Sequence, residues 1–109
     1  PYADAVAEIP EMADKVQEMV RDAAKSFVER DGDLAKAVCR ADDAVDDLFD
    51  VIRKKLTGIV HRDIEGDDNG EQALDMLMVA KYLEKIGDHA SNIAEWVIFM
   101  ITGEHKKLK

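Results

Sequence analysis

The sequence has little of what several classes of protein require. It contains a single cysteine, Cys39, so no disulfide can form within the chain, and a reducing compartment is expected. Its longest apolar run, Trp96 to Ile101, is far shorter than the roughly 20 residues that a membrane helix needs. The start of the chain lacks the basic and apolar regions of a signal peptide. We therefore expect a cytoplasmic protein that is peripheral to a membrane at most.

Positive charge is also scarce. The chain carries 15 Lys and Arg against 24 Asp and Glu, which gives a formal net charge of -9 at pH 7. Such a chain repels nucleic acid and anionic membranes but attracts cations, so no nucleic-acid partner is expected. With 47% hydrophobic and 36% charged residues over 109 positions, the composition is typical of a folded protein, and residues 1–109 are expected to form a single domain.

The alternating pattern of a β-strand is missing. Instead, apolar residues recur every three or four positions in three segments, which predicts three amphipathic helices. The segments span about 10–30, 33–61 and 71–102. Long helices with short connections predict an all-α fold, an antiparallel three-helix bundle. The third helix is expected to direct one stripe inward: Met76, Val79, Leu83, Ile86, Ala90, Ala94, Val97 and Ile101.

Local signals define the expected helix ends. Pro10 suits the first turn of the first helix, and the residues before it are compatible with a separate helical turn. Gly32 at positive φ, with Asp33 as a cap, is expected to separate the first two helices. A polar loop is expected from His61 to Glu71, and Gly103 is placed to end the third helix.

Acidic residues stand where a helix disfavours them. The second helix contains DDAVDDLFD, with five aspartates in nine positions, and like charges four residues apart cost about 0.2–0.5 kcal/mol each. A helical projection puts Asp42 and Asp46 along one edge of the apolar stripe and the other three aspartates in solvent. In the third helix, Glu84 and Asp88 lie along a similar edge.

Two packed antiparallel helices can bring these edges together. Four carboxylates in one place repel unless protons or cations neutralise them, so Asp42, Asp46, Glu84 and Asp88 are a candidate site for hard, oxygen-preferring metal ions. The competing interpretation pairs the acids with nearby cations as ordinary boundary residues. Those cations are Arg40, Arg53, Lys81 and Lys85.

Gly87 lies between the acidic residues of the third helix and costs roughly 1 kcal/mol relative to alanine. It either admits a neighbouring helix or clears space beside the acids. His89 projects away from them. The Glu-x-x-His pairs of a di-iron bundle, a phosphate-binding loop and a nucleophile with a histidine partner are all missing from the sequence. The chain is therefore not expected to be an enzyme.

The sequence resembles the PhoU family, the accessory and regulatory proteins of bacterial phosphate uptake. ADDAVDDLFDVI and, some forty residues later, MLMVAKYLEKIGDHASNIAEWV carry this resemblance, which covers nearly the whole chain. Family members usually contain two three-helix repeats, and this chain is similar to the second. It is either one repeat of a longer protein or a shortened member.

The resemblance implies a metal site and a set of partners. By position, it assigns Asp42, Asp46, Glu84 and Asp88 as ligands, with Asn92 assisting, for iron, Mg, Mn, Ca or Zn. It implies negative regulation of phosphate transport and of the phosphate-starvation response, through contact with the phosphate ABC transporter and a sensor histidine kinase. The alternatives are a carboxylate metalloenzyme acting on phosphate compounds and a structural helical interaction module.

The third helix ends in an apolar stretch, WVIFMI, with side chains on every side. Trp96, Phe99 and Met100 project away from the predicted inward stripe, and such aromatic and Met side chains are typical of protein interfaces. They either pack against residues before Pro10 or a missing repeat, or form a partner interface, for which a homodimer is expected.

Overall fold

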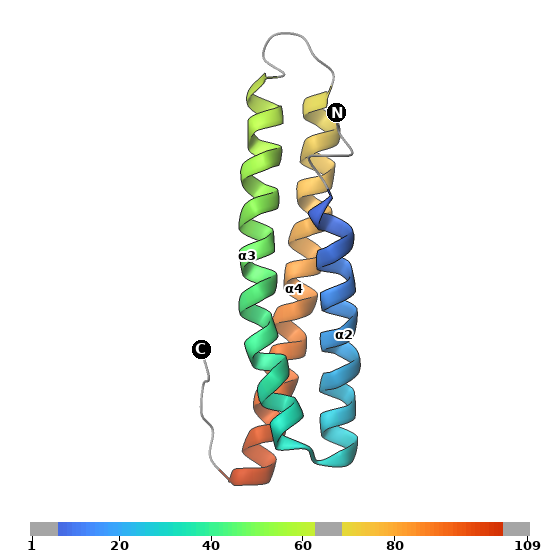
Figure 1. Cartoon of the computed structure of the whole chain (residues 1–109), viewed down its shortest axis with the longest axis vertical. Coiled ribbons are helices and arrows are strands. Elements are labelled where there is room, and N and C mark those ends of the chain that lie inside the picture. Colours follow the sequence, from blue (N-terminus) through green and yellow to red (C-terminus); the bar gives the residue numbers. More distant parts are fainter. Residues whose placement is uncertain (1–6, 63–68, 104–109) are drawn as a thin grey trace.

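The computed structural model describes residues 7–62 and 69–103, which form three helices. They are α2 (Glu8–Glu29), α3 (Gly32–Arg62) and α4 (Asn69–Thr102). The helices run down, up and down along a narrow bundle of 57 × 20 × 15 Å (Figure 1). The described residues contain no strand, so the predicted all-α three-helix bundle is confirmed. In these parts of the chain, no helix combines the length and apolar character needed to cross a lipid bilayer.

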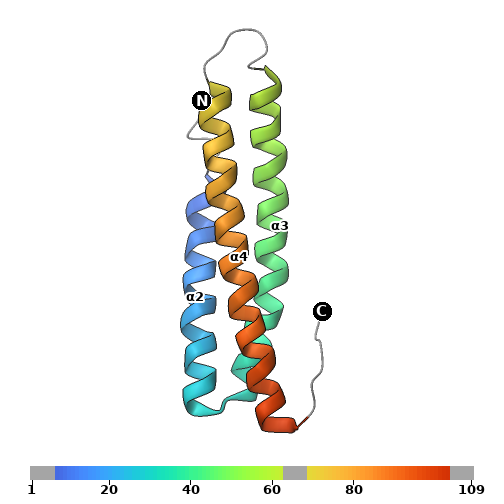
Figure 2. The same cartoon turned by 180° about the vertical axis from the view of Figure 1, so that it is seen from behind.

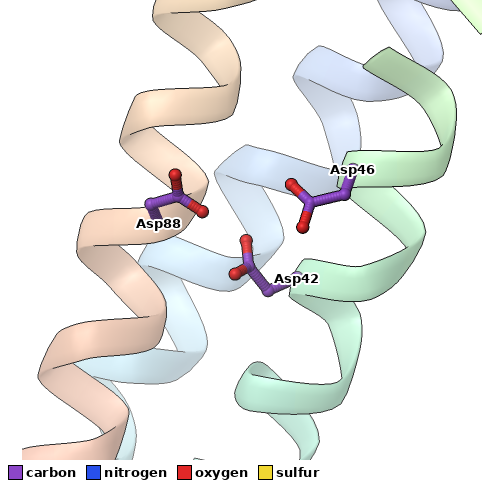
Figure 3. A group of neighbouring side chains, drawn as sticks. All are labelled: Asp42, Asp46 and Asp88. Atoms are coloured by element: carbon purple, nitrogen blue, oxygen red, sulfur yellow. The ribbon is translucent and has the colours of Figure 1, made fainter. Parts of the chain in front are cut away.

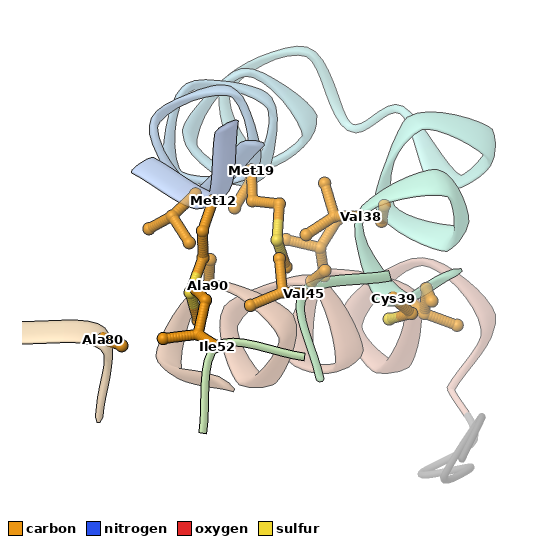
Figure 4. Close-up of a cluster of buried hydrophobic side chains, with 14 of the residues drawn as sticks. Met12, Met19, Val38, Cys39, Val45, Ile52, Ala80 and Ala90 are labelled. Atoms are coloured by element: carbon orange, nitrogen blue, oxygen red, sulfur yellow. The ribbon is translucent and has the colours of Figure 1, made fainter. Parts of the chain in front are cut away.

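Seen from behind, α4 crosses between α2 and α3 and packs on both (Figure 2). Large side chains from α2 and α3, including Met12, Met19 and Ile52, fill the space between the helices (Figure 4). The buried line of α4 consists mainly of small residues at intervals of seven, which lets the helices approach closely. These residues are Ala73, Ala80, Gly87 and Ala94.

The expected inward stripe of α4 was wrong in part. Val79, Ile86 and Ile101 are exposed, whereas Ala90, Ala94 and Val97 are buried as predicted. The difference arises because α4 is apolar on more than one side, so the spacing of large apolar residues does not single out the buried side. On α2 and α3 the predicted stripes mostly face the core, although Val20, Phe27 and Val28 of α2 are exposed.

The turn between α2 and α3 differs from the expected one. Arg30, rather than Gly32, adopts the left-handed conformation, with φ 52°. The N–H groups of Arg30 and Asp31 donate to the carbonyls of Phe27 and Ser26, which closes α2. Asp31, rather than Asp33, caps α3, since its Oδ1 accepts a 3.0 Å hydrogen bond from the N–H of Leu34. Gly32 is already the first residue of α3.

The other helix ends follow the sequence signals more closely. Pro10 lies in the first turn of α2, and Gly103, with φ 73°, donates its N–H to the carbonyl of Phe99 and ends α4 as predicted. His61 is helical, so α3 continues into the stretch expected to be a loop. The centre of that loop, residues 63–68, and most of the expected turn before Pro10 lie outside the described residues.

Candidate metal centre and apolar face

Three aspartates from two helices meet at the side of the bundle. Asp42 and Asp46 of α3 and Asp88 of α4 each offer one carboxylate oxygen, and these oxygens all lie within 4.8 Å of one another (Figure 3). The antiparallel packing of α3 on α4 places the two predicted edges against each other. We call these three residues the aspartate cluster. Like charges this close repel one another, so the cluster attracts a cation.

Asp42 lies deepest in the cluster. Only 1% of its surface is exposed, while Asp46 and Asp88 retain access to solvent. α4 approaches this carboxylate at Gly87, where an added Cβ would lie 3.5 Å from Asp42 Oδ1 and 3.5 Å from Val45 Cγ1. The glycine therefore borders both the helix contact and the acidic site. Those distances are ordinary van der Waals contacts, so alanine would also fit.

Glu84, the fourth predicted ligand, is not gathered into the cluster. Its Oε1 accepts a 2.8 Å hydrogen bond from Lys81 Nζ, one turn earlier on α4. Lys81 also lies 5.1 Å from the centre of the Phe49 ring on α3. This hydrogen bond and the charge of Glu84, followed by the charges of Asp88 and Asp46, raise the pKa of Lys81. The interpretation of the acids as ion-paired boundary residues thus holds for Glu84.

The remaining predicted acids face solvent. Asp43, Asp47 and Asp50 are exposed, as the helical projection indicated, and Asp50 forms a 3.4 Å ion pair with Arg53. Asn92 is exposed one turn beyond Asp88. The aspartate cluster is therefore a subset of the acids in this region, selected by the contact between α3 and α4.

The cluster matches the donor set of a hard cation. Oxygen ligands lie about 2.0–2.6 Å from Mg²⁺ or Ca²⁺, so two ligands of one ion are at most about 5 Å apart. The 4.8 Å limit on the three carboxylate oxygens meets this condition. Three protein oxygens leave positions for water or for another carboxylate. The residues present therefore fit a divalent metal ion.

Two buried residues beside the cluster, Cys39 and Ser91, were not among the predicted site residues. Cys39 precedes Asp42 by three residues, Ser91 follows Asp88 by three, and Cys39 Sγ donates to the carbonyl of Ser91 over 3.8 Å. This contact extends the packing of α3 on α4 by about one turn beyond Asp42 and Asp88. The interval of three from each acid was the available sequence signal, because residues at that spacing share one helix face.

A second surface feature lies on α4. Six exposed apolar residues follow a spacing of three, four and seven, which makes a continuous stripe along a helix. They are Val79, Tyr82, Ile86, Ile93, Trp96 and Met100, and we call them the apolar face. A groove between this helix and α2 adjoins it, lined by Ala13, Val16, Gln17, Val20, Arg21, Leu83 and Ile86.

The predicted interface residues contribute unequally to this face. Trp96 is 55% exposed and Met100 is 41% exposed. Phe99 is half-buried, and its ring meets that of Trp96 edge to face, with centroids 5.4 Å apart and an interplanar angle of 86°. Phe99 thus supports Trp96 at the edge of the apolar face.

Comparison with known proteins places this bundle in a family. Residues 9–97 match the PhoU domain. The chain is 40% identical over 107 residues to a phosphate-specific transport system accessory protein PhoU homolog of Clostridium acetobutylicum, covering 98% of this chain and 48% of that protein.

Two further relatives carry the same description. PhoU homolog 1 of Thermotoga maritima is 39% identical, over 92% of this chain and 42% of its own length. The Pseudomonas putida homolog is 33% identical, over 88% of this chain and 36% of its own length. The chain therefore spans less than half the length of these relatives. No solved structure matches the sequence at a comparable level. The PhoU domain match covers most of the chain, and the chain belongs to the PhoU family.

Proposed function

We propose that this protein is a regulatory accessory protein of phosphate uptake that binds a divalent metal ion at the aspartate cluster. The observation that carries the proposal is the meeting of acids from two helices in a chain of the PhoU family. Asp42, Asp46 and Asp88 are the proposed ligands in the present arrangement, with Glu84 and Asn92 as additional ligands from the next turns of α4.

The metal would act through charge and architecture. A bound iron, Mg, Mn, Ca or Zn ion would neutralise the acids and join α3 to α4. The proposed role is regulation, with no catalysis, because contact with a transporter and a kinase needs a binding surface and no bond-breaking group. Among the described residues, no histidine belongs to the cluster, which agrees with an oxygen-only site.

The proposed partners are the phosphate ABC transporter and a sensor histidine kinase. Their support is the accessory role in phosphate-specific transport that the relatives' names state. By contacting both, the protein would restrain uptake and the phosphate-starvation response. We place it in the cytoplasm, where the reduced, buried thiol of Cys39 is stable.

We further propose that the protein is a homodimer that buries the apolar face. Between Val79 and Met100, α4 is roughly 32 Å long, and with the roughly 11 Å width of one helix the face covers about 350 Å². Two copies together bury about 700 Å² from this face alone, below the roughly 1,200–2,000 Å² of a standard interface, and the adjoining groove between α2 and α4 enlarges the contact.

Charge also favours a second copy at this face. The net charge of -9 makes two copies repel unless they meet away from their acids. Glu84, Asp88 and Glu95 project from a different side of α4 than the apolar face. Lys85 and Asn92 flank the face instead, and His89 lies within its line between Ile86 and Ile93.

The regulatory role can be tested in bacteria that lack their own PhoU-type protein. Expression of this chain is expected to lower phosphate uptake and the signal of a phosphate-starvation reporter. The double variant D42N/D88N, at equal abundance, is expected to lose both effects, whereas D43N/D47N, which removes the same charge from exposed positions, is expected to retain them. Unchanged uptake with the abundant wild-type chain would contradict the proposal.

The dimer can be tested by sedimentation of the purified chain over a concentration series. We expect a wild-type dimer and a monomer for I93E or W96E. V28E is the matched control, because Val28 is an exposed apolar residue of α2 outside the apolar face. A wild-type monomer at all concentrations, or a dimeric I93E variant, would rule this interface out.

A further inference from the structure

Lys81 of α4 lies beside the aspartate cluster, between Glu84 of its own helix and Phe49 of α3. Its Nζ is 2.8 Å from Glu84 Oε1 on α4 and 5.1 Å from the ring centre of Phe49 on α3. Phe49 follows Asp46 by three residues, about one helical turn. The ammonium group therefore lies between the two helices, near Asp46 of α3 and near Glu84 and Asp88 of α4.

The antiparallel register gives Glu84 a place beside the cluster. Asp46 follows Asp42 by four residues, while Glu84 precedes Asp88 by four. Because α3 and α4 run in opposite directions, the level of Asp46 on α3 is the level of Glu84 on α4. Side chains four residues apart on a helix are neighbours, so Glu84 is within reach of Asp88 on one side and of Lys81 on the other. In the structure it binds Lys81.

The ion pair between Lys81 and Glu84 is weak enough for another cation to replace the lysine. Half of the lysine side chain, 49%, is exposed to solvent, and ion pairs with an exposed partner are weak because water and salt screen them. A divalent cation carries twice the charge of an ammonium group. The lysine, however, belongs to the same helix as Glu84, one turn away, so its ammonium group is always near this carboxylate.

We propose that Lys81 is a tethered counter-ion of this acidic site, which holds Glu84 away from the three aspartates and releases it to them when a divalent cation binds. This inference rests on the proposed metal site. Lys81 is then a positioning residue that sets the metal affinity of the site. Glu84 is then a metal ligand that becomes available only after its ion pair with Lys81 breaks.

The test is a calorimetric titration of the purified chain with Mn²⁺. K81Q is expected to bind Mn²⁺ about fivefold more tightly than wild type, because one competing positive charge is lost near the site. K85Q is the matched control, because Lys85 is an exposed lysine of the same helix outside this contact, and we expect it to change the affinity less than about twofold. Equal affinities of K81Q and wild type would overturn the proposal.

A second pair of variants separates a ligand from a bystander. In the K81Q background, E84Q is expected to weaken Mn²⁺ binding about tenfold, because a charged ligand is lost. If E84Q leaves the affinity of K81Q unchanged, Glu84 does not join the site and the proposal is wrong. If D42N binds Mn²⁺ as tightly as wild type, the metal site itself is wrong. If D42N does not bind Mn²⁺ and K81Q binds it as tightly as wild type, the metal site stands and only the proposed role of Lys81 is wrong.

Discussion

Gly87 of α4 lies directly against the buried carboxylate of Asp42 on α3. A Cβ added to Gly87 would stand 3.5 Å from Asp42 Oδ1, with Val45 and Val16 at 3.5 and 3.6 Å. One position thus borders both the core and the candidate metal centre. A small residue suits this contact at the middle of α4, and alanine would fit there as well as glycine does.

The first prediction follows from that contact. Gly87→Ala adds a methyl group that fits within van der Waals distance and removes the glycine from a helix interior, so we expect the metal-free protein to gain up to about 1 kcal/mol of unfolding free energy. Because the added methyl group stays 3.5 Å from Asp42 Oδ1, an ordinary contact, Mn²⁺ should stabilise this variant as much as wild type. Urea unfolding with and without Mn²⁺ measures both effects.

A larger side chain at the same position reverses the sign. Gly87→Val places additional atoms against Val16 and Val45, and we expect a loss of about 1–3 kcal/mol from overpacking. A destabilised Gly87→Ala variant would show that the helices are closer together than in the structure, and a stable Gly87→Val variant would show that they are farther apart.

The second prediction concerns Asp42 without metal. Asp42→Asn keeps the shape of the side chain and removes one of three neighbouring negative charges, so we expect thermal unfolding in chelator to shift upward, by the equivalent of about 0.5–1 kcal/mol. The exposed neighbour provides the control, because Asp43→Asn removes the same charge outside the cluster and should change little. A lower melting temperature for Asp42→Asn in chelator would contradict like-charge repulsion at this site.

The third prediction is a pH dependence at the N-terminal end of α2. Lys55 Nζ donates a 2.6 Å hydrogen bond to Glu8 Oε2, and this bond is the main cause that lowers the pKa of Glu8 below its ordinary value. A lowered acid pKa means that the stabilisation is complete at neutral pH. It is lost as the pH falls through the folded-state pKa.

Comparing wild type with Glu8→Gln tests this contact. At pH 7 the wild type should be more stable by about 0.2–1 kcal/mol, the usual size for a pair near the surface. The difference should disappear below the ordinary glutamate pKa of about 4.3, toward pH 3. A difference that persists at pH 3 would show that the side chain acts through packing and not through its charge.

The fourth prediction separates regulation from catalysis. Because no nucleophile with a histidine partner was found in the sequence and the described cluster is made of aspartates alone, we expect no hydrolysis of phosphate monoesters by the purified chain with Mn²⁺ or Mg²⁺. The control is the D42N/D88N variant, which measures contaminating activity. Turnover by the wild type that this variant lacks would favour a metalloenzyme.

The bundle itself was predictable from periodicity. On α3 the apolar stripe singles out one side, and Val38, Val45 and Ile52 of that stripe are buried. On α4, Val79 and Ile86 continue an equally regular stripe, yet they are exposed. Hydrophobic spacing cannot distinguish a core from a second apolar face on the same helix. The small residues that actually pack, such as Ala80 and Gly87, carry a weak hydrophobic signal.

The candidate site was predictable to the level of helix faces. Projection placed Asp42, Asp46 and Asp88 on edges that the antiparallel packing brings together. It could not show that Glu84 binds Lys81, because the choice between a lysine three residues away and acids across the helix contact depends on side-chain rotamers and local charge. The left-handed residue of the turn was expected at Gly32, because glycine adopts this conformation most readily. In the structure Arg30 adopts it instead.

The central claim is that the aspartate cluster binds a divalent cation, and thermal unfolding in the presence of Mn²⁺ tests it most directly. Binding to the folded state alone stabilises it by about 2.7 kcal/mol at a hundred times the dissociation constant, which corresponds to an upward shift of roughly 10–20 °C for a domain of this size. We predict this shift for the wild type and for D43N/D47N, and no shift for D42N/D88N. A wild-type melting temperature unaffected by Mn²⁺, or an equal shift in D42N/D88N, would contradict the claim.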